Sequence, residues 1–331
     1  ATRYGNPAVA TALVYLGGIN GIASGTPRGA AATLGRFSSF AADVAGAGDV
    51  DGDGFDDVIV GAYQYASGQS DEGGAFVFNL QRASVAPAGS DTIGIYIAAS
   101  GAWFLRNTNS SGGADAVFTF GAGGGGVEPL RGDWDGDGID TPGLFAPSTG
   151  AFFLRNTNSP GGADIVFTFG APNGGYIPMV GDWDGDGTDT IGLYAPSTSV
   201  FFLRNSNAPG GADIVVGFGP AGSGWTPMSG DWDGNGTDTV GLFVPSTSTF
   251  FLRNANAPGG ADVVFGFGPA GSGWTPLAGD FDGNGTDTVG LYSASNGFYF
   301  LRNTNAPGGA DLTFGYGPAG VTPLVGDWDG M

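Results

Sequence analysis

Short runs of apolar residues recur along this chain, and glycine, proline, asparagine and serine separate them. Within residues 165–169, Ile165, Phe167 and Phe169 alternate with Val166 and Thr168. A period of two predicts a β-strand, and apolar residues in both alternating sets predict a sheet that is buried on both faces. No segment has a convincing helical period, so the pattern predicts an all-β protein.

The strand pattern belongs to an internal repeat. Its signature is Gly-Asp-Trp-Asp-Gly, with phenylalanine replacing tryptophan in one copy, and it begins at Gly132, Gly181, Gly230, Gly279 and Gly326, with spacings of 49, 49, 49 and 47 residues. An earlier copy covers residues 48–57, and a degenerate copy without the acidic loop begins near Gly89. In the copy that begins at Gly181, the predicted strands cover residues 176–180, 190–194, 200–204 and 213–218.

A four-stranded unit of about 49 residues fits a propeller blade better than a solenoid coil. The 331 residues of the chain divided by 49 give about 6.8. We therefore predict a single all-β β-propeller over residues 1–331 with about seven four-stranded blades, and six and eight blades are the alternatives. Residues 1–88 are its N-terminal part, residues 89–325 hold five tandem repeats, and residues 326–331 are a partial repeat that can supply a ring-closing strand.

The two ends of the chain resemble parts of one blade. Residues 322–331 have the pattern of the first strand of a further repeat, and residues 8–34 have the pattern of later strands. Pairing the two ends closes the ring within one chain, which we expect. Donating the terminal strand to a neighbouring molecule would instead build a chain of molecules.

The loop of the earliest copy has the spacing of a calcium loop. Asp49, Asp51, Asp53 and Asp57 occupy positions 1, 3, 5 and 9, and the backbone carbonyl of Phe55 is at position 7. Alternating short carboxylates together with a backbone oxygen are the hard ligands that calcium prefers. We therefore predict a calcium site in this loop.

Four later loops have a related pattern, but their fourth carboxylate falls at position 8 and position 9 is threonine. The predicted ligands are Asp133, Asp135, Asp137, Ile139 and Asp140; Asp182, Asp184, Asp186, Thr188 and Asp189; Asp231, Asp233, Asn235, Thr237 and Asp238; and Asp280, Asp282, Asn284, Thr286 and Asp287. Either the position-8 aspartate still reaches the metal or the site is weaker. The alternative is a metal-free turn in which aspartates cap backbone amides.

Residues 48–62, GDVDGDGFDDVIVGA, together with residues 74–78, resemble the FG-GAP repeat of integrin-type propellers. The later copies resemble related repeats of secreted bacterial proteins. The resemblance implies a calcium-bearing β-propeller that is usually extracellular, in a family with adhesive, lectin and structural roles. Two departures stand out: Arg36-Phe37-Ser38 occupies the place of the expected Phe-Gly, and Tyr63 replaces the proline of the motif.

The composition excludes several classes of chemistry. Histidine, cysteine and lysine do not occur in the sequence, which excludes histidine-dependent triads, thiolate nucleophiles, disulfides and a phosphate-binding lysine loop. Ten basic residues face 31 acidic ones, for a net charge of -21, so we expect no nucleic-acid partner. The uncharged residues 8–25 are rich in glycine, and we expect no membrane insertion.

Two other sets of residues recur with the repeat. Each Leu-Arg-Asn arginine is followed nine residues later by an aspartate, giving Arg106 and Asp115, Arg155 and Asp164, Arg204 and Asp213, Arg253 and Asp262, and Arg302 and Asp311. We expect these pairs to brace the hairpin between the third and fourth strands; the alternative is five ligand pockets, as in a lectin.

The aromatic residues of the repeat are predicted to pack inside the protein. Trp134, Trp183, Trp232, Phe281 and Trp328 lie between ligand positions 1 and 3 and should pack between blades. Trp225 and Trp274 precede a first strand. We expect them in the core or at a blade edge, with stacking on sugar rings as the alternative.

Together these features predict a calcium-binding extracellular module, secreted or displayed on a cell surface, with a structural or adhesive role. Almost every acidic residue is assigned to a loop or to an arginine, so we expect no enzyme and no cofactor other than calcium. The expected partner is the protein itself, through its terminal strand, or a surface protein or a glycan. The alternative function is a glycan-binding lectin with repeated sites.

Overall fold

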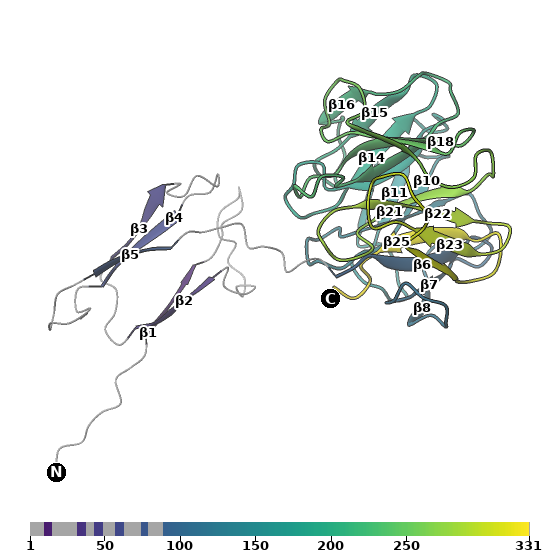
Figure 1. Cartoon of the computed structure of the whole chain (residues 1–331). Helices are drawn as coiled ribbons and strands as arrows, with labels where there is room; N and C mark the ends of the chain where they lie inside the picture. Colours follow the sequence, from purple (N-terminus) through teal and green to yellow (C-terminus); the bar gives the residue numbers. More distant parts are fainter. Residues whose placement is uncertain are drawn as a thin grey trace, which may run out of the picture. The chain divides into compact units, whose positions relative to one another are not determined.

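The computed structural model describes residues 89–330 and, in the N-terminal part of the chain, five strands (Figure 1). These strands are β1 (Ala10–Val14), β2 (Ala32–Phe37), β3 (Asp43–Gly48), β4 (Asp57–Ala62) and β5 (Gly74–Phe78). The chain divides into two compact units, Ala1–Ala86 and Pro87–Met331. In the first unit, β1 pairs with β2, and β3, β4 and β5 form an antiparallel three-stranded sheet.

The second unit contains five four-stranded antiparallel sheets, which we number as blades 1 to 5. Blade 1 consists of β25 (Thr322–Gly326), β6 (Thr92–Ile97), β7 (Ala102–Leu105) and β8 (Ala116–Thr119); blade 2 of β9 (Glu128–Gly132), β10 (Thr141–Ala146), β11 (Ala151–Leu154) and β12 (Ile165–Thr168); blade 3 of β13 (Ile177–Gly181), β14 (Thr190–Ala195), β15 (Val200–Leu203) and β16 (Ile214–Gly217); blade 4 of β17 (Thr226–Gly230), β18 (Thr239–Val244), β19 (Thr249–Leu252) and β20 (Val263–Gly266); and blade 5 of β21 (Thr275–Gly279), β22 (Thr288–Ser293), β23 (Phe298–Leu301) and β24 (Leu312–Gly315).

The first strands of the five blades line the axis of a closed ring. Strand β9 contacts β13, β13 contacts β17, β17 contacts β21, β21 contacts β25, and β25 contacts β9. The protein is thus an all-β propeller with four-stranded blades, as predicted, but it has five blades and not about seven. The predicted count was wrong because it divided the whole chain by the repeat length, whereas the ring uses only the repeats after residue 88.

The C-terminal strand closes the ring on an unexpected partner. Strand β25 pairs antiparallel with β6, with Thr322 opposite Tyr96 and Gly326 opposite Thr92. The sequence pattern instead predicts residues 8–34 as the partner. The degenerate copy near Gly89 explains the difference, because it supplies the second, third and fourth strands of a blade but has no first strand of its own.

The hydrophobic core lies between the blades. Trp183 and Phe201 of blade 3 pack in one buried cluster with Val240 and Leu242 of blade 4. A glycine in each second strand makes room for this packing. A Cβ atom added to Gly192 would lie 2.9 Å from Cδ2 of Leu203, closer than carbon atoms pack in a protein interior.

The outermost strand of each blade departs from the expected burial on both faces. In β12, Phe167 is buried but Val166 is 57% exposed, and Val117, Val215 and Val264 occupy the same outward position in other blades. The prediction that both faces of the sheet are buried is therefore wrong for the outermost strand, where one face is open to solvent. Among the described residues, no helix is long and apolar enough to cross a membrane.

We predict that the ring depends on the packing of its closing strand. Leu324 is buried in a cluster with Trp103 and Phe118 of blade 1. Leu324→Ala should lower the free energy of unfolding by about 2–5 kcal/mol, measured by urea denaturation, because it leaves a cavity. Thr322→Ala, on the exposed end of the same strand, should change it by less than about 0.5 kcal/mol. Equal effects of the two substitutions would contradict this role.

Candidate metal centre

Each acidic loop connects the first strand of a blade to the second. In blade 2 the loop lies between β9 and β10, and its carboxylates Asp133, Asp135 and Asp137 each offer an oxygen within 4.8 Å of the others. Asp182, Asp184 and Asp186 form the same group in blade 3. The structure therefore brings the predicted ligands at positions 1, 3 and 5 of these two loops together.

The position-1 aspartate shapes the turn through hydrogen bonds. Oδ1 of Asp133 accepts the backbone N–H of Gly136 at 2.8 Å and that of Asp137 at 3.0 Å, and Oδ2 accepts that of Gly138 at 2.7 Å. Gly136 and Gly138 have φ values of 72° and 86°, which favour glycine. The turn is thus built by aspartate capping, the arrangement that the metal-free alternative describes, and it also leaves Asp135 and Asp137 exposed to solvent.

Burial, with a smaller effect of neighbouring carboxylates, opposes ionisation of some loop aspartates. Burial raises the pKa of Asp133 and of Asp182 above the ordinary value, despite the backbone N–H groups that lower it. Burial and the charge of Asp186 both raise the pKa of Asp184. These shifts mean that the charged form of these three aspartates is less favourable in the loop than in water, because the backbone N–H groups do not fully offset burial.

The position-8 aspartates lie elsewhere, at the seams between blades. The backbone N–H of Asp189 donates to the backbone oxygen of Asp133 at 2.8 Å, and Oδ2 of Asp189 accepts the backbone N–H of Asp133 at 3.0 Å. The same double hydrogen bond joins Asp238 to Asp182, Asp287 to Asp231, Asp91 to Asp280, and Asp140 to Asp327. Each position-8 side chain therefore holds the loop of the preceding blade and is not part of the converging carboxylate group of its own loop.

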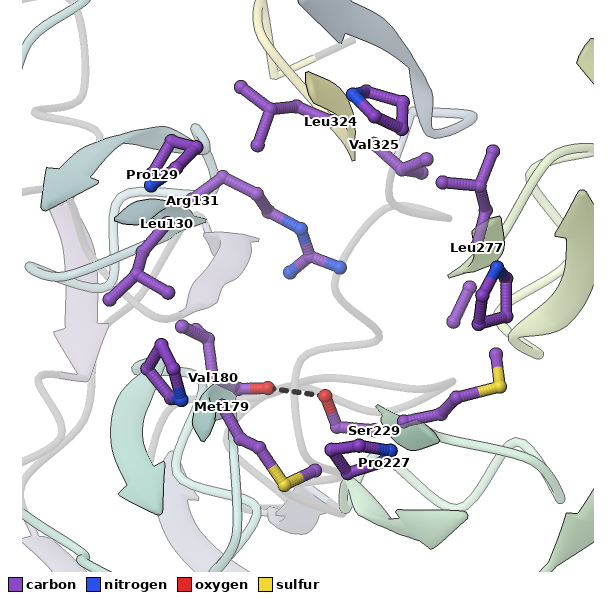
Figure 2. Close-up of a pocket in the computed structure, with 15 residues that line it drawn as sticks. Pro129, Leu130, Arg131, Met179, Val180, Pro227, Ser229, Leu277, Leu324 and Val325 are labelled. Atoms are coloured by element: carbon purple, nitrogen blue, oxygen red, sulfur yellow. Dashed lines mark hydrogen bonds between the residues drawn. The ribbon is translucent and has the colours of Figure 1, made fainter. Parts of the chain in front are cut away.

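One guanidinium faces these five seam carboxylates. Figure 2 shows Arg131 extending from the inner edge of blade 2 into the middle of an axial cavity of about 210 Å³. Its Nη1 lies 3.8 Å from Oδ2 of Asp189. The corresponding positions of the other blades are Val180, Ser229, Ala278 and Val325. Arg131 is thus the one charged side chain among the residues that line this cavity.

The burial of the five seam carboxylates disfavours their charged form. Burial, followed by the charge of Asp140, raises the pKa of Asp189 to about 8, and burial raises that of Asp287 to about 6. Burial also raises the pKa values of Asp91, Asp140 and Asp238. Arg131 lowers the pKa of all five, so its single positive charge offsets part of their repulsion.

The Leu-Arg-Asn arginines brace their hairpins mainly through backbone oxygens. Nε of Arg155 donates to the carbonyl of Ser159 at 2.7 Å, and Nη1 donates to that of Gly162 at 2.6 Å. Asp164 accepts the backbone N–H of Asn156 at 2.9 Å. Among the described residues, direct ion pairs of this set join only Arg253 with Asp262 and Arg302 with Asp311. Both members of each pair therefore brace the hairpin, but usually through separate backbone partners.

An asparagine that the sequence analysis did not select lies beside the acidic loop. Nδ2 of Asn156 donates to Oδ2 of Asp135 at 3.1 Å, whereas Oδ1 of Asn156 is buried and has no hydrogen-bond partner. Asn205, Asn254 and Asn303 have the same unpartnered oxygen in blades 3, 4 and 5. The signal in the sequence was the asparagine of every Leu-Arg-Asn motif, which recurs in register with the acidic loops.

The aromatic residues have the predicted structural roles. Trp134, Trp183, Trp232, Phe281 and Trp328 are all buried between blades. Trp225 is half-buried and stacks on Phe251 with ring centroids 5.1 Å apart, and Trp274 stacks on Phe300 at 4.5 Å. The prediction of core or blade-edge packing is confirmed. The predicted ligands Asp49, Asp51, Asp53 and Phe55 and the side chain of Asp57 lie outside the described residues.

Comparison with known proteins supports the fold. The model of the FG-GAP repeat family matches residues 40–78, which confirms the resemblance inferred from the sequence. No curated protein matches. Four solved chains match; one is a lectin of Agrocybe aegerita, described as recognising non-reducing terminal N-acetylglucosamine, with 17% identity and a TM-score of 0.41.

The alignment with this lectin covers 61% of the present chain and 57% of the lectin chain, which is less than two thirds of the lectin's length. In this chain, the match to the FG-GAP repeat family lies in the first unit, and the five-bladed β-propeller is the second.

We predict that stability in chelator depends on pH through Asp189. Its folded pKa of about 8 lies above the unfolded value of about 3.9. Its favourable contribution is therefore fully present below about pH 4 and is lost as the pH rises toward 8. Asp189→Asn should raise the unfolding free energy at pH 8 and leave it nearly unchanged at pH 4. The control Asp164→Asn alters an exposed carboxylate that also accepts a backbone N–H, and a similar gain there would contradict the prediction.

We predict that Arg131 stabilises the ring through its charge. In Arg131→Met, the seam carboxylates lose the one positive charge that lowers their pKa. The loss of melting temperature should therefore be larger at pH 8 than at pH 4, and Arg131→Lys should recover most of it. An equal loss at both pH values would show that packing of the side chain, and not its charge, is responsible.

Proposed function

We propose that this protein is a calcium-binding propeller module of the extracellular space with a structural or adhesive role. The observation that carries the proposal is the convergence of three carboxylates in the loops of two successive blades. Blades 4 and 5 have aspartate, aspartate and asparagine at the same three positions. An asparagine oxygen is an ordinary calcium ligand, so these loops retain the same donor chemistry.

The available donors suit a hard cation. In blade 2 these are carboxylate oxygens of Asp133, Asp135 and Asp137, the backbone carbonyl of Ile139 and the unpartnered Oδ1 of Asn156. All are oxygens, and all except that of Asn156, which follows β11, come from a turn that Asp133 already organises. Calcium accepts six to eight such ligands in variable geometry, whereas magnesium requires a near-ideal octahedron and retains several waters. This donor set therefore favours calcium.

The amide of Asn156 can adapt to a cation. Its Nδ2 now faces Asp135 and its Oδ1 is buried without a partner. Rotating the amide by half a turn would direct the oxygen toward the carboxylates, which is unfavourable beside negative charge alone and favourable beside a cation. A bound calcium ion would supply the positive charge that makes this arrangement stable.

The exposure of the loops agrees with an extracellular location. Asp135, Asp137 and Asp186 are open to solvent, and exposed sites of this kind bind calcium with the weak affinities typical of extracellular modules, about 10⁻⁴–10⁻³ M. The sequence contains no cysteine that could form a disulfide. Calcium would therefore take over the cross-linking of the loops.

The arrangement of the propeller favours a rigid display module over a filament. Strand β25 makes its pairs within the chain, with β6, so the unpaired strand that suggested self-assembly is already used. The lectin alternative stays a prediction from the sequence. The features that suggested it, the repeated arginines and Trp225 and Trp274, are engaged by their own blades.

We predict that calcium stabilises the protein and that chelation lowers its melting temperature. The gain should be about 2.7 kcal/mol for each site at a calcium concentration 100 times its Kd. Asp182→Asn combined with Asp184→Asn should remove one calcium ion per chain in isothermal titration calorimetry, because these residues supply two carboxylates of one loop.

The matched control for the calcium experiment is Glu128→Gln, which removes a carboxylate charge outside the acidic loops. It should leave the number of bound ions unchanged. Asn156→Ala should weaken one site without removing it. An unchanged melt in excess chelator, with no heat of calcium binding, would contradict the proposal and favour turns that are capped by aspartate alone.

A further inference from the structure

The five junctions between blades are not filled alike. The residue two positions before the proline of each first strand faces a junction, and this residue is Val127, Tyr176, Trp225, Trp274 or Val321. At three junctions it is aromatic and contacts a phenylalanine of the same blade: Tyr176 lies edge-on to Phe202, Trp225 stacks on Phe251, and Trp274 stacks on Phe300. At the other two junctions only a valine is present.

The atoms nearest to the glycine that follows each blade's fourth strand show which side chains fill the next junction. A Cβ atom added to Gly219 would lie 3.5 Å from the Trp225 ring, and one added to Gly170 would lie 3.3 Å from the Tyr176 ring. At Gly121, the equivalent residue before Val127, the nearest atoms belong to the side chain of Leu144, and at Gly268, before Trp274, they belong to Leu291 and Ser248. Val127 is much smaller than a tyrosine or tryptophan, and it lines a cavity at the junction of blades 1 and 2, where the sister junctions hold an aromatic ring.

A cavity of about 600 Å³ occupies this junction. Phe120, Val127, Leu144 and Phe153 line it together with residues 160–163, and none of its lining residues is charged. Its volume is within the range of about 300–1,000 Å³ that is usual for small-molecule sites. Phe153 is the counterpart of Phe251, so the surface on which Trp225 stacks in blade 4 is present here without a covering ring.

The rim of this cavity is also open. Residues 123–126 are four consecutive glycines, and a Cβ atom added to Gly124, Gly125 or Gly126 would meet no other atom within 4 Å. The sister segment before Trp274 is Gly-Ser-Gly, and its two glycines, Gly271 and Gly273, have φ values of 67° and 71°. A second polypeptide can therefore approach the rim at blade 2 without displacing side chains. The junction of blades 5 and 1 holds a smaller cavity of about 200 Å³, lined by Ile95, Phe104 and Tyr316 among others.

We propose that the cavity between blades 1 and 2 binds the tryptophan side chain of a partner polypeptide, with its indole stacked on Phe153. The partner's indole would take the position that Trp225 and Trp274 take in blades 4 and 5. Offset stacking on a phenylalanine, together with burial of the indole in an apolar pocket, supplies the binding energy. This site is independent of the acidic loops and does not need calcium.

The test uses N-acetyl-L-tryptophanamide as the probe and N-acetyl-L-leucinamide as its non-aromatic control, both followed by ligand-observed NMR. Wild type and Val127→Ala should bind the tryptophan probe at one site and discriminate against the leucine probe. Val127→Trp should bind it at least tenfold more weakly, because the new side chain fills the cavity. Trp274→Val should gain a second site, because it opens the equivalent space in blade 5.

The thermal melts of the same variants provide a second readout. Val127→Trp should melt at the temperature of wild type or above, because the cavity accepts an indole without strain. The proposal is overturned if wild type does not bind the tryptophan probe, if Val127→Trp binds it as well as wild type, or if the leucine probe binds equally well. A lower melting temperature for Val127→Trp than for Val127→Ala would also overturn it, since the cavity would then not fit an indole.

Discussion

The double hydrogen bond between the acidic loops of neighbouring blades is the constraint on which this propeller depends. At each seam, a position-8 aspartate donates its backbone N–H to the preceding loop and accepts a backbone N–H from that loop through its carboxylate. Five such pairs run around the ring, and the pair of Asp140 with Asp327 includes the C-terminal strand in the same pattern. The loops are therefore parts of the seams as well as candidate ligands.

This constraint explains the unusual distribution of charge. The seam places five carboxylates where they are largely removed from water, and this burial raises their pKa values. The positive charge of Arg131, a residue of blade 2, lowers these pKa values and so offsets part of the unfavourable burial of the carboxylates. The remaining carboxylates, at positions 3 and 5, face outward into solvent. Each loop region thus separates an inner carboxylate, whose hydrogen bond joins two blades although its charge is unfavourable there, from outer carboxylates that are free to meet a cation.

Much of the local structure could be predicted because each blade repeats the same spacing of strands, turns and buried aromatic residues. In the copy that begins at Gly181, the predicted strands match β13 to β16 to within a residue or two at each end, and the tryptophans of the signature are buried as expected. The cavity beside Val127 also has a visible origin, since valine replaces the tryptophan of sister repeats. The role of Asp189 was not predictable, because its hydrogen-bond partner Asp133 lies 56 residues away in another blade.

The sequence by itself determined the blade: its four strands, its acidic turn and its apolar faces follow from spacing and residue type within about 49 residues. Only the tertiary structure decided the number of blades, the partner of the closing strand and the division of the aspartates between seam and loop. These depend on the angle at which one blade packs on the next and on which free strand edge remains when the ring closes. Such properties arise between repeats, so no pattern within a single repeat encodes them.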